Sequence, residues 1–534
     1  MNRVGWLALV LGCGSAPKGP PPSVDSGASS PVDSAAPVTA LPRIVSGPNF
    51  ISAGPAAPLT QWLELSTDVP CTVSLELEAP DGETLVRAWA GSATEHRLPV
   101  LELLADTRFT ATVRVQAAFG EAVASGDLTT DPLPFPLPTL QVLAHDPARM
   151  QPGLTVMPMQ AGELDQWVGV LDAQLRWRHL LQIPAKVNDV RFGDDGDLWL
   201  IAGSAVERRA VDGTVHARWH AQADTPESVF VDLVGDFHHE VVPLGDRFLS
   251  LARRSASVPD YPFERNATGA GRAAEVLVPL VVEVGLDGTI LREVDLARAL
   301  DVRRIGMDSN NDTEMGLDWG HANAVIPDGP DHWIVSLRHQ DAVVRLTRDG
   351  EVDWILANHD GWPDRLRPHL LAPVGGFDWP FHQHAPERLA DGGIALFDNG
   401  NYGHTPYGEP PDTPQRSRLR IVDVDPVART VTDRWSLDET PATGALFGWA
   451  MGDADVLANG NLLGVYGHLA GEAGRTNEAA GRGETHARVL ELALDDPEHP
   501  VLDLRMSSRR SVVPLGWRVY RAQRIDRLHP SVVR

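Results

Sequence analysis

The sequence predicts an all-β protein in which a six-bladed β-propeller, residues 150–530, follows a small β-sandwich, residues 42–135. Three observations predict this class. A strand–turn–strand unit recurs loosely past residue 150, and such repetition is typical of propellers. In the earlier part, apolar and polar residues alternate with a period of two, as in half-buried strands. Long helical periodicity is almost absent, which argues against an α/β enzyme.

The N-terminal segment has the pattern of an export signal. Met1–Arg3 is a short basic start, and the apolar run Val4–Leu11 follows it. Because the next residues, Gly-Cys, complete a stretch that resembles a bacterial lipobox, we expect a lipoprotein signal peptide at residues 1–12 and lipidation of Cys13. The alternative is an ordinary signal peptide with a chance cysteine. The lipobox interpretation predicts an exported protein, lipid-anchored to a bacterial membrane and facing the periplasm or the cell surface.

Residues 13–41 are rich in Ser, Pro, Ala and Gly, a composition that cannot bury a core. We therefore expect a flexible tether between the lipid and the folded body. Cys71 is the only other cysteine, so acylation of Cys13 leaves no pair for an intrachain disulfide.

Charge limits the partners of this protein. Its 534 residues carry a formal net charge of −26, and lysine occurs only at Lys18 and Lys186. An acidic surface argues against broad nucleic-acid binding, which needs a basic footprint. It also means that an anionic substrate must be captured by local positive charge, because the overall field repels it.

The predicted β-sandwich has short alternating strands, such as residues 71–77 and 108–115, separated by turn signals such as Pro80–Gly82. This pattern is typical of immunoglobulin- or fibronectin-like domains. A proline-rich connector at residues 131–138 then marks the boundary to the propeller.

The predicted propeller is indicated by repeated strand–turn–strand segments. Residues 190–200, 387–397 and 455–464 share an apolar strand, a turn of Asp, Asn or Gly, and a second apolar strand. Blades are expected to start near residues 154, 187, 239, 321, 384 and 452. The late run 517–522 is expected to supply a strand that closes the ring.

Three histidines fall at one position of this repeat. Each stands five residues before an apolar residue at the hairpin turn, namely His239 before Leu244, His321 before Ile326 and His384 before Leu389. Because the first strand of each blade lines the central channel, equivalent positions form a ring there. The neighbouring His238 is expected to face the other way unless a bulge exchanges the two. In the last blade, Gly452 and Asp453 occupy this register.

Arg338 is expected to lie across a hairpin from His321. The two are equidistant from the turn at residues 327–331, and directly opposed residues have Cβ atoms about 5 Å apart. The guanidinium fork matches oxyanions such as sulfate. Asn323 should point to the same side as His321 and add a neutral hydrogen bond. His339 should face away and be structural.

Several imidazoles and a guanidinium, without an evident carboxylate pair, suit transfer of a sulfuryl group. An imidazole can attack sulfur and hold the group covalently, which divides one difficult displacement into two easier ones. Arginine and the other histidines can stabilise charge on the sulfuryl oxygens. A histidine can also protonate the leaving phenoxide and then deprotonate the incoming phenol.

These residues lie in short motifs at 236–240, 318–323, 336–340, 377–384 and 397–400. Together the motifs resemble those of bacterial aryl-sulfate sulfotransferases, over roughly residues 150 to 530, and the preceding sandwich matches the layout of that family. The resemblance implies ping-pong transfer from a phenolic sulfate ester to a phenol, without an adenosine-phosphosulfate donor and without a cofactor or metal. This sequence departs from better-known members in lacking a cysteine pair, so it gives no support for a disulfide maturation step.

The resemblance also implies roles for individual residues. By motif, His384 is the transiently sulfurylated nucleophile, and His321, Arg338 and His239 complete the catalytic group. The substrate-binding residues are expected to be Asn323, His238 and Asn399. The acidic stretch 308–314 lacks the full spacing of a calcium loop and is expected to be a solvated loop at the channel mouth.

Two other functions remain open at this point. Three histidines can hold a metal in a hydrolase or oxidase, although a neighbouring Arg338 would repel the cation. The propeller could also be a non-catalytic binding module at the cell surface, because fold alone never fixes function. The expected partners are small aryl sulfates and phenols, the membrane through the lipid anchor, and a second copy in a homodimer, but no nucleic acid.

Overall fold

The computed structural model describes residues 41–162, 165–193, 195–222, 224–263, 271–440, 444–471, 485–508 and 516–533. The predicted signal peptide, Cys13 and nearly all of the predicted tether lie outside these residues. In the described ranges, no helix has the length and apolar character needed to cross a membrane. One short helix, α1 (Leu296–Leu300), and two 3₁₀ turns, η1 (Arg338–Gln340) and η2 (Arg367–His369), accompany many strands. The all-β prediction is confirmed.

The N-terminal part forms a six-stranded antiparallel sheet. Its strands are β1 (Ile44–Ser52), β2 (Gln61–Glu78), β3 (Thr84–Val100), β4 (Arg108–Ala117), β5 (Gly120–Thr129) and the C-terminal β36 (Val532–Val533). The order is β36-β3-β2-β4-β5, and β1 pairs with β2. Alternate residues of β4 are buried, as the period-two pattern predicts. All six strands belong to one hydrogen-bonded network, so the pairing does not divide them into the two facing sheets that the sequence predicts.

Six further sheets follow, which we number I to VI. Sheet I holds β7 (Leu154–Ala161), β8 (Asp165–Leu171), β9 (Trp177–Gln182), β34 (Arg518–Val519) and β35 (Gln523–Ile525). Sheet II holds β10 (Val187–Phe192), β11 (Leu198–Ala202), β12 (Ala205–Arg209), β13 (Val215–His220) and β14 (Ser228–Phe230). Sheet III holds β15 (Asp236–Pro243), β16 (Arg247–Tyr261), β17 (Arg272–Gly285), β18 (Ile290–Asp295), β19 (Asp312–Thr313) and β20 (Gly316–Leu317).

The other three sheets have the same antiparallel hairpin plan. Sheet IV holds β21 (Ala322–Pro327), β22 (His332–Leu337), β23 (Ala342–Thr347) and β24 (Val352–Ala357). Sheet V holds β25 (Ala372–Pro373), β26 (His384–Arg388), β27 (Gly393–Asp398), β28 (Arg418–Asp425) and β29 (Thr430–Leu437). Sheet VI holds β30 (Asp453–Val456), β31 (Asn461–Ala470), β32 (Thr485–Ala493), β33 (Leu502–Ser507) and β6 (Thr139–His145).

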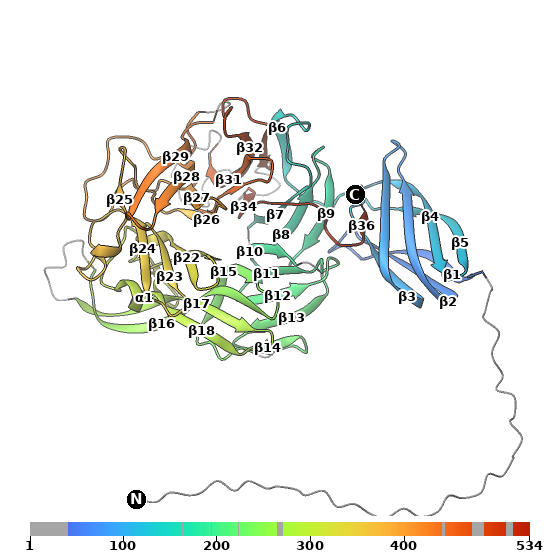
Figure 1. Cartoon of the computed structure of the whole chain (residues 1–534), viewed down its shortest axis with the longest axis horizontal. Helices are drawn as coiled ribbons and strands as arrows, with labels where there is room; N and C mark the ends of the chain where they lie inside the picture. Colours follow the sequence, from blue (N-terminus) through green and yellow to red (C-terminus); the bar gives the residue numbers. More distant parts are fainter. Residues whose placement is uncertain are drawn as a thin grey trace, which may run out of the picture.

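The six sheets are arranged like the blades of a propeller. Figure 1 shows them following one another around a common centre, with the N-terminal sheet to one side. Their first strands are neighbours in turn: β7 contacts β10, and β10, β15, β21, β26 and β30 continue the series. Residues from both ends complete two sheets, because β34 and β35 pair with β7 and β6 pairs with β33. The expectation that the run 517–522 contributes a closing strand is met by β34.

The cores lie between neighbouring sheets. All ten residues of β31 are buried, as are most residues of β7 and β27, because each inner sheet is covered on both faces. This explains why these strands have continuous apolar runs while β4 of the N-terminal sheet alternates. Burial of such apolar surface, worth about 25 cal/mol per Å², is the main source of stability for the ring.

Four of the six first strands, β10, β15, β21 and β26, share an irregularity near their N-terminal ends. Register shifts occur after Val187 in β10, after His238 in β15, after Ala322 in β21 and after His384 in β26. Such bulges leave residues unpaired and redirect side chains, and they are common beside active sites. The predicted site histidines therefore stand where the ladders are least regular.

The register expected for His321 is corrected. The hairpins of sheets IV and V have loops of equal length, and in these hairpins Ile326 pairs with Ile334 while Glu387 pairs with Ala395. The counterpart of Ile326 is therefore Glu387 and not Leu389. His321 consequently lies two residues nearer to the N-terminal start of its hairpin than His384 does. The sequence comparison missed this offset because Leu389, the apolar residue used as its reference, lies in the turn at the place that Asp328 takes in sheet IV.

Candidate active site

His384, the predicted nucleophile, begins β26 and is only 3% exposed. Its Nδ1 atom lies 2.6 Å from Oδ1 of Asn399 and 3.1 Å from the carbonyl oxygen of His382. Both of these atoms are acceptors, so Nδ1 carries the proton in the neutral ring. The other nitrogen, Nε2, lies 3.3 Å from the backbone N–H of Met451, which donates to it. The lone pair needed for nucleophilic attack is therefore on Nε2.

Asn399 holds this arrangement from the end of β27. Its Nδ2 group donates to the carbonyl oxygens of Gly448 at 2.8 Å and of Met451 at 3.0 Å, which directs Oδ1 toward His384. The residue is completely buried. The sequence predicts that Asn399 binds substrate, but in the structure its amide group contacts the nucleophile and the backbone that precedes β30.

The surroundings of His384 keep its ring neutral. Burial, followed by the positive charge of Arg338, holds the pKa of His384 well below its ordinary value. Burial and the neighbouring histidines act in the same direction on the pKa of His239. Neutral imidazole is the form that can attack an electrophile, so the environment favours the reactive state.

Arg338 stands at the end of β22 and is 5% exposed. Its backbone N–H donates to the carbonyl oxygen of His321 at 3.1 Å, so the two residues are neighbours across the hairpin as predicted. Its Nη1 group donates to Nε2 of His339 at 2.8 Å and lies 3.4 Å from a carboxylate oxygen of Asp308. Nη2 donates to the carbonyl oxygen of Trp449 at 3.3 Å. The Nε group is buried and has no partner among the described residues.

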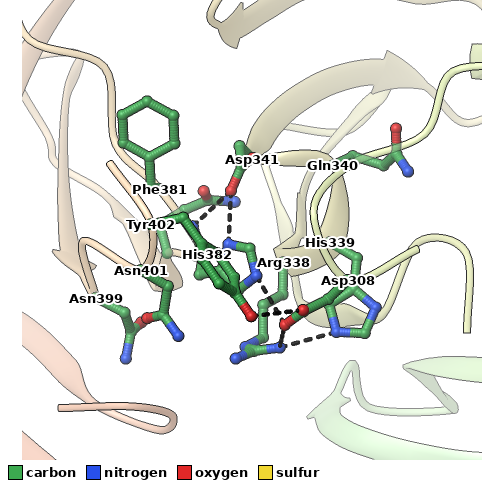
Figure 2. Close-up of polar contacts among 12 residues, drawn as sticks. Asp308, Arg338, His339, Gln340, Asp341, Phe381, His382, Asn399, Asn401 and Tyr402 are labelled. Atoms are coloured by element: carbon green, nitrogen blue, oxygen red, sulfur yellow. Dashed lines mark hydrogen bonds and ion pairs between the residues drawn. The ribbon is translucent and has the colours of Figure 1, made fainter. Parts of the chain in front are cut away.

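Asp308 connects Arg338 to a second histidine. His382 donates from Nε2 to Asp308 at 3.1 Å, and its Nδ1 lies 2.8 Å from Oδ1 of Asp341. The Tyr402 hydroxyl donates to the other oxygen of Asp308 at 2.9 Å. The His382 ring thus lies between two carboxylates. Figure 2 shows Arg338, His382 and Tyr402 meeting at Asp308.

The lowered pKa of the Asp308 carboxyl agrees with its position between Arg338 and His382. Burial acts to raise the pKa of the Asp308 carboxyl, but the hydrogen bond and charge of His382 outweigh it and hold that pKa below its ordinary value. The carboxylate is thus ionised, and it contacts Arg338 on one side and His382 on the other. The sequence predicts a solvated loop at residues 308–314; this is wrong for Asp308, which is 6% exposed and points into the site. The composition of this stretch could not predict the burial of Asp308, because its hydrogen-bond partners lie far from it in the sequence.

The second part of the cluster is a series of histidine rings. Ring centroids are 4.8 Å apart for His238 and His239, 4.9 Å for His239 and His321, and 4.6 Å for His321 and His339. His238 and His239 also share a hydrogen bond of 2.6 Å between their Nδ1 atoms. The bulge in β15 therefore brings both histidines to the site, where the sequence predicts opposite faces. Both His239 and His321 adopt positive φ, 62° and 42°, an uncommon conformation for non-glycine residues that is often found at functional sites.

Asp318 orients His321. A carboxylate oxygen lies 2.5 Å from Nδ1 of His321, so this nitrogen donates and Nε2 is left for substrate. Burial acts to raise the pKa of Asp318, but the charge and hydrogen bond of His321 lower it below its ordinary value. An ionised carboxylate behind an imidazole stabilises the protonated ring, which suits a general acid and base.

His339 is not the outward-facing structural residue that the sequence predicts. It is 2% exposed, donates from Nδ1 to the carbonyl oxygen of Asp318 at 2.6 Å, and accepts from Arg338 through Nε2. The 3₁₀ turn η1 breaks the alternation of β22 and turns His339 inward. Counting alternate faces from Arg338 could not predict that His339 points inward, because side chains alternate between faces only while the strand continues.

Asn323 is fully buried. Its Nδ2 group donates to the carbonyl oxygen of Gln383 at 2.8 Å, and its Oδ1 atom has no partner among the described residues. The Asn323 side chain therefore connects β21 of sheet IV to Gln383, the residue directly before His384 in sheet V.

One triad could hold a metal ion. Asp318, His321 and His339 each offer a ligand atom, and these atoms lie within 4.8 Å of one another. Such donors suit zinc or copper. The guanidinium of Arg338, however, lies 2.8 Å from Nε2 of His339 and would oppose a cation there.

The residues that the sequence reasoning missed are His382, Asp308, Asp318 and Tyr402. His382 and Asp318 lie inside motifs that were recognised, three residues or fewer from a predicted site histidine, so proximity within the motif was a usable signal. Asp308 and Tyr402 lie on loops, and no spacing rule places them.

Comparisons with known proteins identify relatives of part of this chain. Arylsulfate sulfotransferase AssT of Escherichia coli O6:H1 is 31% identical over 172 residues, and AssT of Lelliottia amnigena is 29% identical over 172 residues. Each alignment spans 28% of this chain and 28% of the relative. Among solved structures, a protein of unknown function from Bacteroides caccae matches with a TM-score of 0.38 and 12% identity, covering 70% of this chain and 98% of that one.

The family comparison covers a larger part of the chain. The family model described as Arylsulfotransferase (ASST) matches residues 139–504, which include strands of all six sheets and the histidines, Arg338, Asp308 and Asp318 of the cluster. The chain therefore belongs to the arylsulfotransferase family.

Proposed function

We propose that this protein is an aryl-sulfate sulfotransferase that carries a sulfuryl group from a phenolic sulfate ester to a phenol by a ping-pong mechanism. The observation that carries the proposal is the tautomer of His384: Asn399 and the His382 carbonyl fix the proton on Nδ1 and leave Nε2 as nucleophile. Family membership and the arylsulfate sulfotransferase relatives support the substrate class.

In the first half-reaction, Nε2 of His384 attacks the sulfur of the donor, and the bond between sulfur and the phenolic oxygen breaks. The leaving phenoxide takes a proton from His321, whose protonated form is stabilised by Asp318. The sulfuryl group stays on Nε2 as sulfohistidine. The ring then carries positive charge, and Oδ1 of Asn399 stabilises it by accepting the Nδ1 hydrogen bond.

In the second half-reaction, His321 takes the proton of an incoming phenol, whose oxygen attacks the same sulfur. The sulfur–nitrogen bond breaks, the electron pair returns to Nε2, and the new aryl sulfate leaves. The enzyme is then back in its starting protonation state, so the cycle needs no cofactor.

Local positive charge supports capture of the anionic donor by an acidic protein. Arg338 is close to the nucleophile, since its charge lowers the pKa of His384, and its Nε group has no described partner. His238 also has an unpartnered buried nitrogen, Nε2. These donors suit the sulfuryl oxygens, whose charge changes as the group is transferred.

A metal-dependent activity is the second candidate, because Asp318, His321 and His339 could hold a metal ion. It is less well supported than sulfuryl transfer, since the guanidinium beside His339 opposes a cation.

The test is incubation of the purified protein with a chromogenic aryl sulfate, with and without a phenol acceptor. We expect release of the chromophore to depend on the acceptor and the acceptor to become sulfated. His384→Ala should lower the rate by on the order of 10³-fold or more. Donor alone should leave one sulfuryl group on a His384 peptide in mass spectrometry. Full activity of His384→Ala in a folded protein would refute the nucleophile.

We further propose that the six sheets are the blades of one propeller domain and that the N-terminal strands are a small sandwich domain. From the N-terminal sequence, we also propose export and lipid anchoring through Cys13, with the folded body facing the periplasm or the cell surface. Labelling of the expressed protein with a radioactive fatty acid, compared with Cys13→Ser, tests the anchor.

A further inference from the structure

The strand that closes the ring carries a cation without a partner. Arg518 begins β34 and is half-buried. Its side chain has no hydrogen bond or ion pair with any described residue, and burial lowers its pKa with no carboxylate of the described residues to offset the effect. Several other buried arginines of this acidic protein are paired, such as Arg420 with Asp433 and Arg488 with Asp503. Because a partly desolvated charge without a partner is unfavourable, the free guanidinium indicates a place for an anionic ligand.

Arg518 points to the side of its strand that faces the histidines. Its neighbours Trp517 and Val519 are fully buried in the core between sheets I and VI. Since side chains alternate along an extended chain, Arg518 points away from that core, to the same side as Tyr520. The Tyr520 ring lies with its centroid 6.0 Å from that of His239. Arg518 therefore stands two residues before a side chain that reaches the catalytic cluster.

A second polar side chain, His468, lies beside this position. It follows Gly467 in β31, where a side chain in place of the glycine would collide with the carbonyl oxygen of Val519. Glycine thus lets β31 and β34 approach each other closely. His468 is 3% exposed, and burial, followed by the charges of Arg518 and Arg338, lowers its pKa to about 3. The ring is therefore neutral, so it offers a hydrogen-bonding group but does not neutralise the guanidinium.

Backbone contacts connect this position to the nucleophile. The N–H of Trp449 donates to the carbonyl oxygen of His468 at 3.2 Å. The carbonyl oxygen of Trp449 in turn accepts from Arg338 at 3.3 Å. The glycine before His468 also approaches Met451, whose N–H donates to Nε2 of His384. The free cation and the nucleophile thus belong to one continuous region.

The two guanidinium groups lie at different distances from the nucleophile. Among the charges that act on the His384 ring, that of Arg338 lowers its pKa most. Among those that act on His468, the charge of Arg518 comes first. The sulfuryl oxygens stay bonded to the sulfur on His384 and meet Arg338, whereas a substituent across the phenol ring extends farther out, to Arg518. In a protein of net charge −26, an anionic substituent needs such a local cation.

We propose that Arg518, with His468 beside it, binds a carboxylate carried on the ring of the phenol, so that the enzyme prefers carboxylated phenols and their sulfate esters. The fork of a guanidinium matches the two oxygens of a carboxylate. The proposal rests on the sulfotransferase function and names its substrate class. Because the incoming phenol takes the place of the leaving phenol, the same contact serves donor and acceptor in turn.

The kinetic test uses two acceptors of the same shape, 4-hydroxyphenylacetate and its uncharged amide, with 2-naphthyl sulfate as the donor. We expect wild type to prefer the acid in kcat/KM for the acceptor. Arg518→Gln should lower this value for the acid about 10- to 100-fold, the usual loss of a hydrogen bond to a charged group, and leave the value for the amide unchanged. Turnover of the amide shows that the variant is folded. Arg518→Lys should keep part of the preference, since lysine retains the charge but not the fork.

The control variant is Arg505→Gln, which changes a half-buried arginine of β33, the strand of sheet VI that pairs with β6. It should keep the wild-type preference for the acid. The burst of 2-naphthol from the donor alone should be the same in Arg518→Gln and wild type, because this donor has no carboxylate. An Arg518→Gln enzyme that still prefers the acid would overturn the carboxylate site.

A binding test separates this proposal from the proposed function. The probe is 4-methoxyphenylacetate, which has the carboxylate but no phenolic hydroxyl and cannot accept a sulfuryl group; its amide is the comparison. Binding is measured by saturation-transfer NMR with wild type, His384→Ala and Arg518→Gln. We expect the acid to bind to the first two more tightly than the amide does, and to lose this advantage in the third. This pattern in a protein without transferase activity would refute the function and keep the carboxylate site. Equal binding of acid and amide to wild type would overturn the site and leave the function intact.

Discussion

Oδ1 of Asn399 lies 2.6 Å from Nδ1 of His384, and the Asn399 amide is fixed in this orientation by two backbone carbonyls. This contact decides which nitrogen of the predicted nucleophile carries the proton and which carries the lone pair. It links the end of β27 in sheet V to the start of β26 beside it. Four predictions start from this site.

Asn399→Ala is expected to reduce kcat/KM for an aryl sulfate by roughly 10²-fold, the usual cost of losing one preorganised polar contact. The ring of His384 would lose the contact that fixes its tautomer, so Nε2 would carry the reactive lone pair less often. The measurement is initial-rate kinetics with a chromogenic donor. Asn461→Ala, a buried asparagine of sheet VI, is the matched control and should keep activity. Equal losses in both variants would mean that Asn399 acts only through stability.

Arg338→Lys is expected to lower kcat/KM about 10- to 100-fold while keeping one positive charge, because lysine cannot reproduce the guanidinium fork. The loss should be greatest for kcat/KM of the anionic donor. Arg345→Lys, in β23 of the same sheet, is the control, since Arg345 is paired with Asp328 away from the cluster. An Arg338→Lys enzyme with full donor affinity would show that the guanidinium does not hold the sulfuryl oxygens.

The pH dependence of the first half-reaction follows from the lowered pKa of His384. Burial and Arg338 lower this pKa, and neutral imidazole is the reactive form, so the nucleophile stays active at lower pH than an ordinary histidine would. We expect the burst rate to persist below about pH 6.5, the ordinary histidine value. Rapid-mix measurement of the burst between acidic and neutral pH gives the profile. A fall centred at the ordinary value would contradict a neutral, desolvated His384.

Removal of metal ions is expected to leave sulfuryl transfer unchanged, because the proposed steps use only side chains. Added zinc should not raise the rate, since the guanidinium of Arg338 beside His339 opposes a cation at Asp318, His321 and His339. The measurement is the transfer rate after dialysis against a chelator, with elemental analysis of the same sample. Activity that disappears with the chelator and returns with zinc would favour the metal-dependent alternative.

Much of the fold could be predicted from local patterns. Turn residues between apolar runs gave the strand pairs, and the repeat starts near residues 187, 239, 321 and 384 fall within three residues of β10, β15, β21 and β26. The pairing of the N-terminal strands could not be predicted in this way, because alternation identifies a buried face but not the neighbouring strand. For the same reason, the sequence did not predict the pairing of β6. This strand precedes the predicted propeller boundary at residue 150 and pairs with β33 near the C-terminal end of the chain.

The residues of the candidate site also fall into two groups: those that sequence patterns placed correctly and those that they did not. Motifs identified His239, His321, Arg338 and His384, and the hairpin argument correctly placed Arg338 across from His321. Counting along strands failed at the bulges, where His238 turned out to contact His239.

By itself, the sequence determined the all-β class, the chemical groups available for sulfuryl transfer and the motifs that mark the arylsulfotransferase family. These depend on residue type and short-range spacing, which the chain contains directly. Only the tertiary structure decided that Asn399 fixes the tautomer of His384 and that Asp308 restrains Arg338. The first contact joins the ends of two neighbouring strands of sheet V, and the second joins the segment before β19 to the end of β22 in the next sheet, so their geometry depends on the folded chain. His384 was thus recognised as the candidate nucleophile from a motif, whereas the orientation that places its proton on Nδ1 is a property of the folded protein.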